Sequence, residues 1–336
     1  MVYKNVGFKV FFFIGKGGVG KTTCAAAFAV KVARYKRTLI ISLDPAHNLG
    51  DVLGVELSEK PTRVVDNLFA VEVDFESMIR SHLENLVDKV KGMYRYLRVL
   101  NLDSYIDVLR YSPGIEEYAT LDKITEVLKW NISRGEYEVI VFDTPPTGLT
   151  LRIMALPSIS SIWVDKLMKL RIQILDRRRI IEKITGEKIK TIIGGRVFEA
   201  PSKPEDDPVY NELVRIKSDI NLVNSIVKNP ATTTTVIVVN PETLPIVEAK
   251  RALNFLGKLG IPVKYIIVNK VLSVTQIPEN LKPKIEEQER ALRMINEYFT
   301  NLKVVKIPFL CEEPKGLSKL QNISIHMDKI LAEVEG

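Results

Sequence analysis

A glycine-rich stretch near the amino terminus has the residue types that bind a phosphate chain. It consists of Gly15, Lys16, Gly17, Gly18, Val19, Gly20, Lys21 and Thr22. The order matches the pattern G-x-x-x-x-G-K-[ST]. Glycines let successive backbone N–H groups turn toward phosphate oxygens, Lys21 places a charge at the β- and γ-phosphates, and Thr22 can ligate Mg²⁺. The stretch therefore predicts binding of Mg·ATP.

The sequence around this loop has the context that the pattern requires. Residues 10–14 form a short apolar run that predicts a buried strand, and residues 21–34 have the composition of a helix. A helix that begins at the end of such a loop adds a favourable dipole for anions. The alternative, a glycine turn that binds nothing, does not account for this order of strand, loop and helix.

Acidic residues follow two other apolar runs. Asp44 comes after residues 38–43, and Asp51 lies seven positions later. Asp143 directly follows residues 138–142. The carboxyl ends of strands are where a doubly wound sheet binds its ligands. One carboxylate of the first pair could hold the shell of Mg²⁺ and the other could orient the attacking water. Asp143 is expected to be the Walker B-like acid, with capping of the next turn as the alternative.

The order of the predicted elements indicates the fold class. Runs typical of doubly buried parallel strands occur at 10–14, 38–43, 68–73, 138–142, 235–239, 265–268 and 303–307. Segments with helical apolar spacing lie between the later runs, at 245–259 and 283–299. This alternation predicts an α/β protein with a doubly wound, mostly parallel sheet.

Two connections, residues 75–130 and 150–231, are far longer than a crossover needs and predict inserted helices. We expect a nucleotide-binding core of residues 1–74, 136–150 and 232–336, and a helical insertion of residues 75–135 and 151–231. In the insertion, Leu167, Leu170 and Ile174 recur at helical spacing beside a second apolar row. Such rows fit either a groove for an apolar client or the core of a helical subdomain, and the sequence leaves both open.

Composition narrows the partners and the compartment. The chain of 336 residues carries a formal charge of +7, but no run of five or six basic residues, so nucleic acid is not an expected partner. The two cysteines, Cys24 and Cys311, lie far apart and lack the C-x-x-C spacing of a zinc or redox site. The apolar run at 10–14 is too short for a spanning helix. A reducing, cytoplasmic location is expected.

These motifs together resemble the family of the arsenite-pump ATPase ArsA and of the ATPase that targets tail-anchored proteins in the guided-entry pathway. Lys16, a second lysine near the start of the loop, is the mark of the deviant Walker A class. The resemblance covers nearly the whole chain and rests on residues 15–23, 44–51, 113–117, 143–152, Asn269 and 308–316. It implies a P-loop NTPase fold of the SIMIBI type with an inserted α-helical subdomain.

The resemblance also implies roles for single residues. Asp51 looks like the carboxylate that positions water, Lys21 like the catalytic lysine of the loop, and Lys16 like the lysine that reaches the partner's nucleotide in a homodimer. The implied Mg²⁺ set, partly through water, is Thr22, Asp44 and Asp143. The implied nucleotide contacts outside residues 15–22 are Thr23, Asn240, Asn269, Pro308 and Phe309.

Further expectations concern partners. In the family, helical insertions of two subunits close with ATP around the transmembrane helix of a client, and here the groove would include Leu167, Leu170 and Ile174. A membrane receptor and transient membrane association are implied. No zinc is expected, because residues 271–288 contain no cysteine. The alternatives are an ArsA-like metalloid-transport ATPase subunit and a partition or membrane-positioning ATPase.

Overall fold

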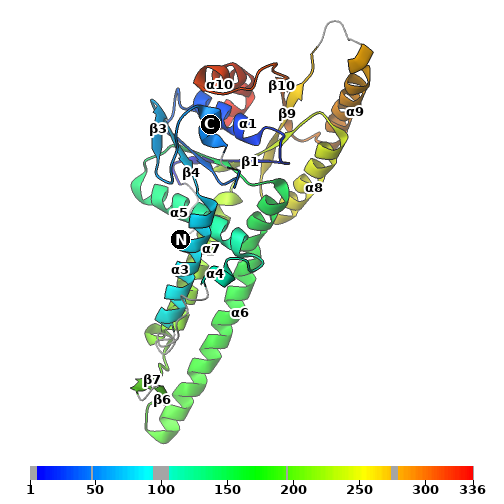
Figure 1. Cartoon of the computed structure of the whole chain (residues 1–336). Coiled ribbons are helices and arrows are strands. Elements are labelled where there is room, and N and C mark those ends of the chain that lie inside the picture. Colours follow the sequence, from blue (N-terminus) through cyan, green and yellow to red (C-terminus); the bar gives the residue numbers. More distant parts are fainter. Residues whose placement is uncertain (1–5, 47, 94–105, 194–195, 274–278, 336) are drawn as a thin grey trace. The chain divides into compact units, whose positions relative to one another are not determined.

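The structure of the chain is a computed structural model that describes residues 6–46, 48–93, 106–193, 196–273 and 279–335. Its main feature is an eight-stranded sheet in the order β10-β9-β8-β1-β5-β2-β4-β3 (Figure 1). The strands are β1 Lys9–Gly15, β2 Thr38–Ser42, β3 Thr62–Val65, β4 Leu68–Glu72, β5 Val139–Asp143, β8 Thr233–Val239, β9 Val263–Val271 and β10 Lys303–Pro308. The seven strands predicted from the apolar runs are present and parallel to one another. The predicted fold class is confirmed.

The eighth strand is one that the sequence reading missed. β3 pairs antiparallel with β4 at the edge of the sheet, and its residues alternate between half-buried and exposed. An edge strand with one solvated face carries no continuous apolar run. The short run Thr62–Val65 therefore gave no signal like those of the central strands.

The central strands form because nearly every side chain in them is apolar and buried. In β1, the residues Val10 to Ile14 are at most 1% exposed. Phe12 stacks on Phe142 of β5 with ring centroids 4.9 Å apart, while Phe11 packs on Phe28 of the first helix. Burying each such aromatic side chain contributes roughly 1.5–3 kcal/mol. The strand that leads into the glycine-rich loop is thus among the best-packed parts of the chain.

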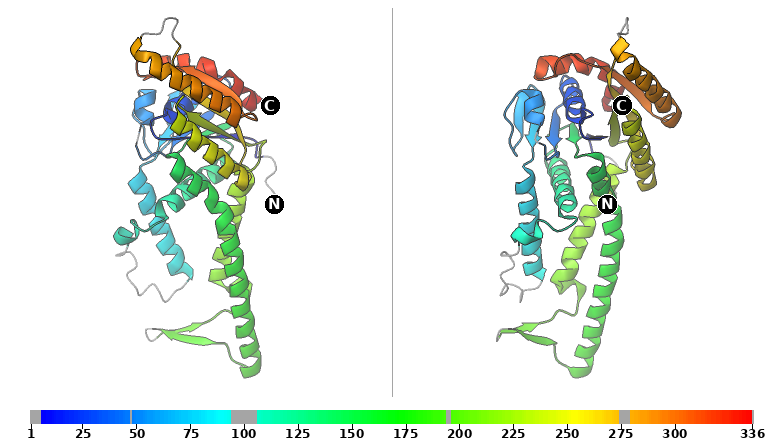
Figure 2. Two further views of the ribbon diagram at one scale, coloured as in Figure 1. Left: turned by 90° about the vertical axis from the view of Figure 1, so that its right-hand side faces the viewer. Right: turned by 45° about the vertical axis from the view of Figure 1, so that its right-hand side comes forward.

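Helices cover both faces of this sheet (Figure 2). Helices α1 Lys21–Val32, α10 Leu317–Ser324 and α11 Asp328–Glu335 pack on one face, where they meet alternate β8 residues such as Val236 and Val238. Helices α8 Thr243–Leu259 and α9 Lys282–Tyr298 pack on the other face, against Ile237 and Val239. Because the side chains of a strand alternate between faces, each face of the sheet is buried under helices.

The chain divides into two compact units. The first comprises residues 1–77, 126–154 and 225–336, and the second comprises residues 78–125 and 155–224. The helices α3 Phe75–Met93, α5 Ile115–Arg134, α6 Thr147–Thr185 and α7 Pro208–Val227 contribute to both units, and the short helix α4 Ile106–Leu109 belongs to the second. The second unit also contains a hairpin, β6 Lys190–Ile193 with β7 Arg196–Glu199, which the sequence reading did not predict.

The second unit has a small core of its own. Val164 of α6 packs with Val209, Leu213 and Ile220 of α7. Beside this core, the guanidinium of Arg171 donates two hydrogen bonds to the buried carboxylate of Asp207, at 2.9 and 2.6 Å. Breaking a buried ion pair by removing one partner costs about 3–5 kcal/mol. The pair therefore holds α6 to the start of α7 within this unit.

Candidate nucleotide site

The glycine-rich loop joins β1 to α1, and its backbone conformation requires glycine. A Cβ at Gly15 would lie 2.5 Å from the carbonyl oxygen of Val238. Gly18 and Gly20 adopt left-handed φ angles of 81° and 87°, a region that side chains with a Cβ rarely occupy. A Cβ at Gly20 would also lie 2.4 Å from the side-chain nitrogen of Asn269. The loop is thus shaped by neighbours on two other strands, β8 and β9.

Asp143, the last residue of β5, is fully buried beside the start of α1. Its Oδ2 accepts hydrogen bonds from the hydroxyls of Thr22, at 2.7 Å, and Ser42, at 3.3 Å. Its Oδ1 is buried without a hydrogen-bond partner. Burial raises the pKa of Asp143 to about 7, although the Thr22 hydrogen bond and the charge of Lys21 act in the opposite direction. A carboxylate with an unsatisfied oxygen in this position favours a cation.

Lys21 and Asp44 form the second charged pair at this edge. The Nζ of the nearly buried Lys21 lies 3.4 Å from Oδ2 of Asp44. The other oxygen of Asp44 accepts a hydrogen bond from the backbone N–H of Ala46, which fixes the turn after β2. Carboxylates and a hydroxyl are the hard oxygen ligands that Mg²⁺ prefers. Thr22, Asp44 and the unpaired oxygen of Asp143 would therefore supply suitable ligands for a magnesium ion.

Asp51 lies on a short helix, α2 Leu49–Leu53, and its side chain is exposed. The amino-terminal end of α2 is capped by Glu72 of β4. Its Oε1 accepts hydrogen bonds from the backbone N–H groups of Leu49, at 2.8 Å, and Gly50, at 3.3 Å. The sequence reading assigned no role to Glu72, since nothing in a strand pattern shows that its last residue reaches a helix on another connection. His47, which lies between Asp44 and Asp51 in the sequence, is outside the described residues.

Three of the implied nucleotide contacts, Asn269, Pro308 and Phe309, lie on β9 and at the end of β10. Asn269 donates to the carbonyl oxygen of Val19 at 2.8 Å. The backbone N–H of Phe309 donates to the carbonyl oxygen of Val271 at 2.8 Å, so Pro308 and Phe309 lie beside the end of β9. The side chain of Phe309 is half exposed. An exposed aromatic ring at this edge is available to stack on a base.

Two further polar residues, Lys270 and Asn240, lie near the glycine-rich loop. Lys270, with a left-handed φ of 59°, donates through Nζ to the carbonyl oxygen of Gly18 at 3.0 Å. The sequence reading did not single it out. Asn240 directly follows β8, and its side-chain oxygen is buried without a hydrogen-bond partner. Both residues thus bring polar groups to the same sheet edge as the loop.

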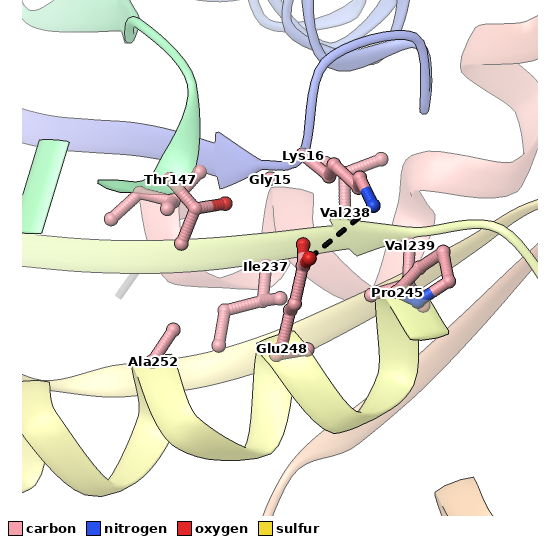
Figure 3. Close-up of a pocket in the computed structure, with 11 residues that line it drawn as sticks. Gly15, Lys16, Thr147, Ile237, Val238, Val239, Pro245, Glu248 and Ala252 are labelled. Carbon is pink, nitrogen blue, oxygen red and sulfur yellow. Dashed lines mark ion pairs between the residues drawn. The ribbon is translucent and has the colours of Figure 1, made fainter. Parts of the chain in front are cut away.

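Lys16 points toward α8 (Figure 3). Its Nζ lies 3.3 Å from Oε1 of Glu248, and the two side chains are 46% and 40% exposed (Figure 3). The pair lies over a pocket lined by the end of β1, by β8, by α8 and by Thr147. Lys16 is therefore paired within its own chain, with Glu248, a residue that was not predicted from the sequence.

The predicted client-groove residues are not part of this edge. Leu167, Leu170 and Ile174 lie in the second unit, and their side chains are exposed. Cys24 is buried in α1, where burial raises the pKa of its thiol to about 12, and Cys311 is exposed. Among the described residues, no group of three or more His, Cys, Asp or Glu side chains could hold a metal ion.

Comparison with known proteins matches this arrangement to one family. The profile of the anion-transporting ATPases matches residues 8–329. The chain is 31% identical, over 94% of its length and 98% of the relative's, to a putative arsenical pump-driving ATPase 2 of Aquifex aeolicus. It is 32% identical, over 92% of its length and 88% of the relative's, to an ATPase get3 of Pyrenophora tritici-repentis. A putative arsenical pump-driving ATPase 1 of Aquifex aeolicus is 29% identical over 94% of the chain and 78% of that relative.

Proposed function

Because the chain belongs to the anion-transporting ATPase family, we propose that it is a Mg²⁺-dependent ATPase that works as a homodimer and captures the transmembrane helix of tail-anchored membrane proteins. It would act in the cytoplasm, deliver its client to a membrane receptor, and bind no nucleic acid. The observation that carries the client part of this proposal is an exposed apolar stripe on α6. The nucleotide part rests on the side chains gathered at the carboxyl edge of the sheet.

In the proposed reaction, each group at the sheet edge has one task. The loop N–H groups and Lys21 would bind the β- and γ-phosphates. Thr22, Asp44 and Asp143 would hold Mg²⁺, which would supply positive charge near the phosphates. Asp51 orients the water that attacks the γ-phosphate. Lys16 leaves Glu248 and supplies a further charge to the partner's nucleotide, as an arginine finger does elsewhere. Hydrolysis would then switch the dimer between open and closed states.

The stripe on α6 consists of large apolar side chains that remain accessible. Trp163 is 61% exposed, Leu170 53%, Leu167 46% and Ile174 36%. They are separated by three or four residues, so they lie on one side of the helix. Ile159 and Ile181 extend the stripe, because each lies eleven residues from Leu170, which is about three helical turns, and both are exposed. Contiguous exposed apolar surface of this kind marks an interaction site.

A different apolar side of α6 contributes to the core of the second unit, so that core does not need the side chains of the stripe. Val164 and Leu175 are buried, and Met168 packs against the α7 cluster. These residues lie about a third of a turn away from the stripe at 100° per residue. The two interpretations that the apolar rows left open thus apply to different sides of one helix. The core interpretation accounts for one side, and the proposed client groove for the other.

The length of the stripe fits a membrane helix. From Ile159 to Ile181 it extends about 33 Å at 1.5 Å per residue, close to the length of the roughly 20 apolar residues that cross a bilayer. Burying such a client gains about 25 cal/mol per Å² of apolar area. Among the described helices, α6 is the one long and apolar enough to span a membrane, with a window of mean hydropathy 1.2 that is 33% buried. Core helices of soluble proteins pass the same criterion. The apolar character of α6 therefore favours an apolar partner and does not place α6 in a membrane.

The proposal is tested by ATP hydrolysis and native mass, with wild type beside Asp51→Asn and with and without a tail-anchored peptide kept free of detergent. We expect slow hydrolysis that Asp51→Asn abolishes, and a peptide-bound dimer in that variant when ATP is present. Hydrolysis without peptide binding in any nucleotide state would reject the client assignment and leave the ATPase.

A transport role is the second candidate, because two of the relatives are named arsenical pump-driving ATPases. Binding of a soft metalloid needs thiolates. The sequence has only Cys24 and Cys311, and the high pKa of the buried Cys24 thiol disfavours its thiolate. Turnover that rises with arsenite would favour this candidate, and turnover that is flat with arsenite would dismiss it.

A further inference from the structure

The helix that carries Asp51 is too short to hold itself in place. α2 spans five residues, Leu49–Leu53, and Asn48 before it makes no side-chain capping hydrogen bond. A helix this short has almost no stability of its own, because nucleation is costly and the first N–H groups lack partners. The position of Asp51 must therefore be set by contacts from other elements.

Glu72 supplies the contact at the amino-terminal end. Its Oε1 accepts from Leu49 and Gly50, the two residues directly before Asp51. A carboxylate at this end also complements the helix dipole. The approach is close, since a Cβ on Gly50 would lie 2.9 Å from the carbonyl oxygen of Val55 and 3.3 Å from Oε2 of Glu72.

The base of this cap is rigid and connected to the predicted magnesium residues. Glu72 ends β4, where its register partner on β2 is Ser42. The Ser42 hydroxyl in turn donates to Asp143. At the other end of α2, the backbone N–H of Gly316 donates to the carbonyl oxygen of Val52 at 2.9 Å. α2 is thus held at both ends, and the side-chain contact comes from the strand next to the one that leads to Asp44.

We propose that Glu72 is a positioning residue for hydrolysis, which orients Asp51 toward the attacking water by capping α2. The inference rests on the proposed function, in which Asp51 acts on that water. Glu72 does not touch the nucleotide. Removing it should therefore lower kcat and leave the KM for ATP unchanged.

The kinetic test uses the full-length chain with the Mg·ATP concentration varied up to saturation. Glu72→Leu removes the acceptor and should lower kcat about 10- to 100-fold with KM within about 2-fold of wild type. Glu72→Gln keeps an acceptor oxygen and should retain most of kcat. Gly50→Ala crowds the same cap and should resemble Glu72→Leu.

Hydrogen exchange measures the cap independently of activity. The amides of Leu49 and Gly50 should exchange faster in Glu72→Leu than in wild type, with the rest of the sheet unchanged. Wild-type kcat in a Glu72→Leu variant with fast exchange would overturn the proposal, as would a rise in the KM for ATP as large as the fall in kcat. If Glu72→Leu does not fold, the comparison of Gly50→Ala with Glu72→Gln decides. Should Asp51→Asn retain activity, the proposed function itself fails, and the exchange result remains interpretable.

Discussion

The Nζ of Lys16 and a carboxylate oxygen of Glu248 lie 3.3 Å apart within one subunit. If Lys16 serves the partner's nucleotide, this ion pair must break when the dimer closes. Exposed ion pairs of this kind contribute about 0–1 kcal/mol. Under the proposed function, the pair would therefore be a weak restraint that competes with dimer closure.

Substitution of Glu248 should make closure easier. We expect Glu248→Gln to lower the ATP concentration needed for half-maximal dimer formation by up to about 5-fold at low salt, and by less when salt screens the pair. Sedimentation with ATP in the Asp51→Asn background measures this. Glu242→Gln is the matched control, because it removes an ion pair of the same region, to Lys284, without touching Lys16. An equal shift in both variants would contradict the competition.

The raised pKa of Asp143 predicts how stability depends on pH. In the folded chain this pKa is about 7 instead of 3.8. Between about pH 4 and pH 7 the folded state therefore holds a proton that the unfolded state has released, so stability without nucleotide falls as the pH rises through this window and levels off above it. Asp143→Asn should lose this component, of the order of 1 kcal/mol for each pH unit. Thermal unfolding of both proteins from about pH 4 to pH 8 measures the difference.

Bound Mg²⁺ should have the opposite effect on Asp143, since it favours the charged carboxylate over the protonated form. A bound cation favours the charged form of Asp143, so stabilisation by Mg·nucleotide should grow from about pH 5 to pH 7 in the wild type. In Asp143→Asn this growth should be absent. A pH-independent Mg²⁺ effect in the wild type would remove Asp143 from the proposed magnesium ligands.

Two glycines of the loop should differ sharply in their tolerance of a methyl group. Gly20 has a left-handed φ, and a Cβ on it would meet Asn269, whereas a Cβ on Gly17 would have no neighbour within 4 Å. Gly20→Ala should weaken ATP binding by more than about 10-fold, since strain of this kind costs about 1–3 kcal/mol. Gly17→Ala should stay within about 3-fold, unless the methyl group meets the phosphates themselves. Titration with a fluorescent ATP analogue compares the two, and equal losses would show that contact with the nucleotide, not loop strain, decides.

The apolar stripe on α6 should be needed for client capture and not for hydrolysis. Leu167→Asp with Ile174→Asp should abolish binding of a tail-anchored peptide, because charges on the stripe would be desolvated by an apolar client. Basal ATP turnover and thermal stability should change little, since both side chains are exposed. Gln173→Asp, an exposed polar neighbour of Ile174, is the control. Copurification and peptide crosslinking measure capture, and unimpaired binding by the double variant would contradict the groove.

Much of the fold could be read from the sequence because central parallel strands are buried on both faces. The predicted strands are built on runs of apolar and β-branched residues, such as 10–14 and 265–268, and that pattern has few other interpretations. β3 and the hairpin β6–β7 were missed, since strands of four residues with mixed polarity carry no comparable signal. Apolar content alone does not identify an edge strand or a hairpin in an insertion.

The sequence by itself determined which residues form the candidate phosphate loop, since the glycines, Lys21 and Thr22 are consecutive and their chemistry is local. It also placed Asp44 and Asp143 at strand ends, and so at one edge of the sheet. The roles of Asp51 and Lys16 remain predictions. Only the tertiary structure decided that Glu72, Glu248 and Lys270 join this edge, because each reaches it from a distant element.

The same distinction applies to α6. Helical spacing places Leu167 and Ile174 on one side of the helix, but the spacing is the same whether that side is packed or exposed. The tertiary structure packs Val164 and Leu175 inside and leaves the stripe accessible. Burial depends on which elements meet in space, and a single sequence records that only indirectly.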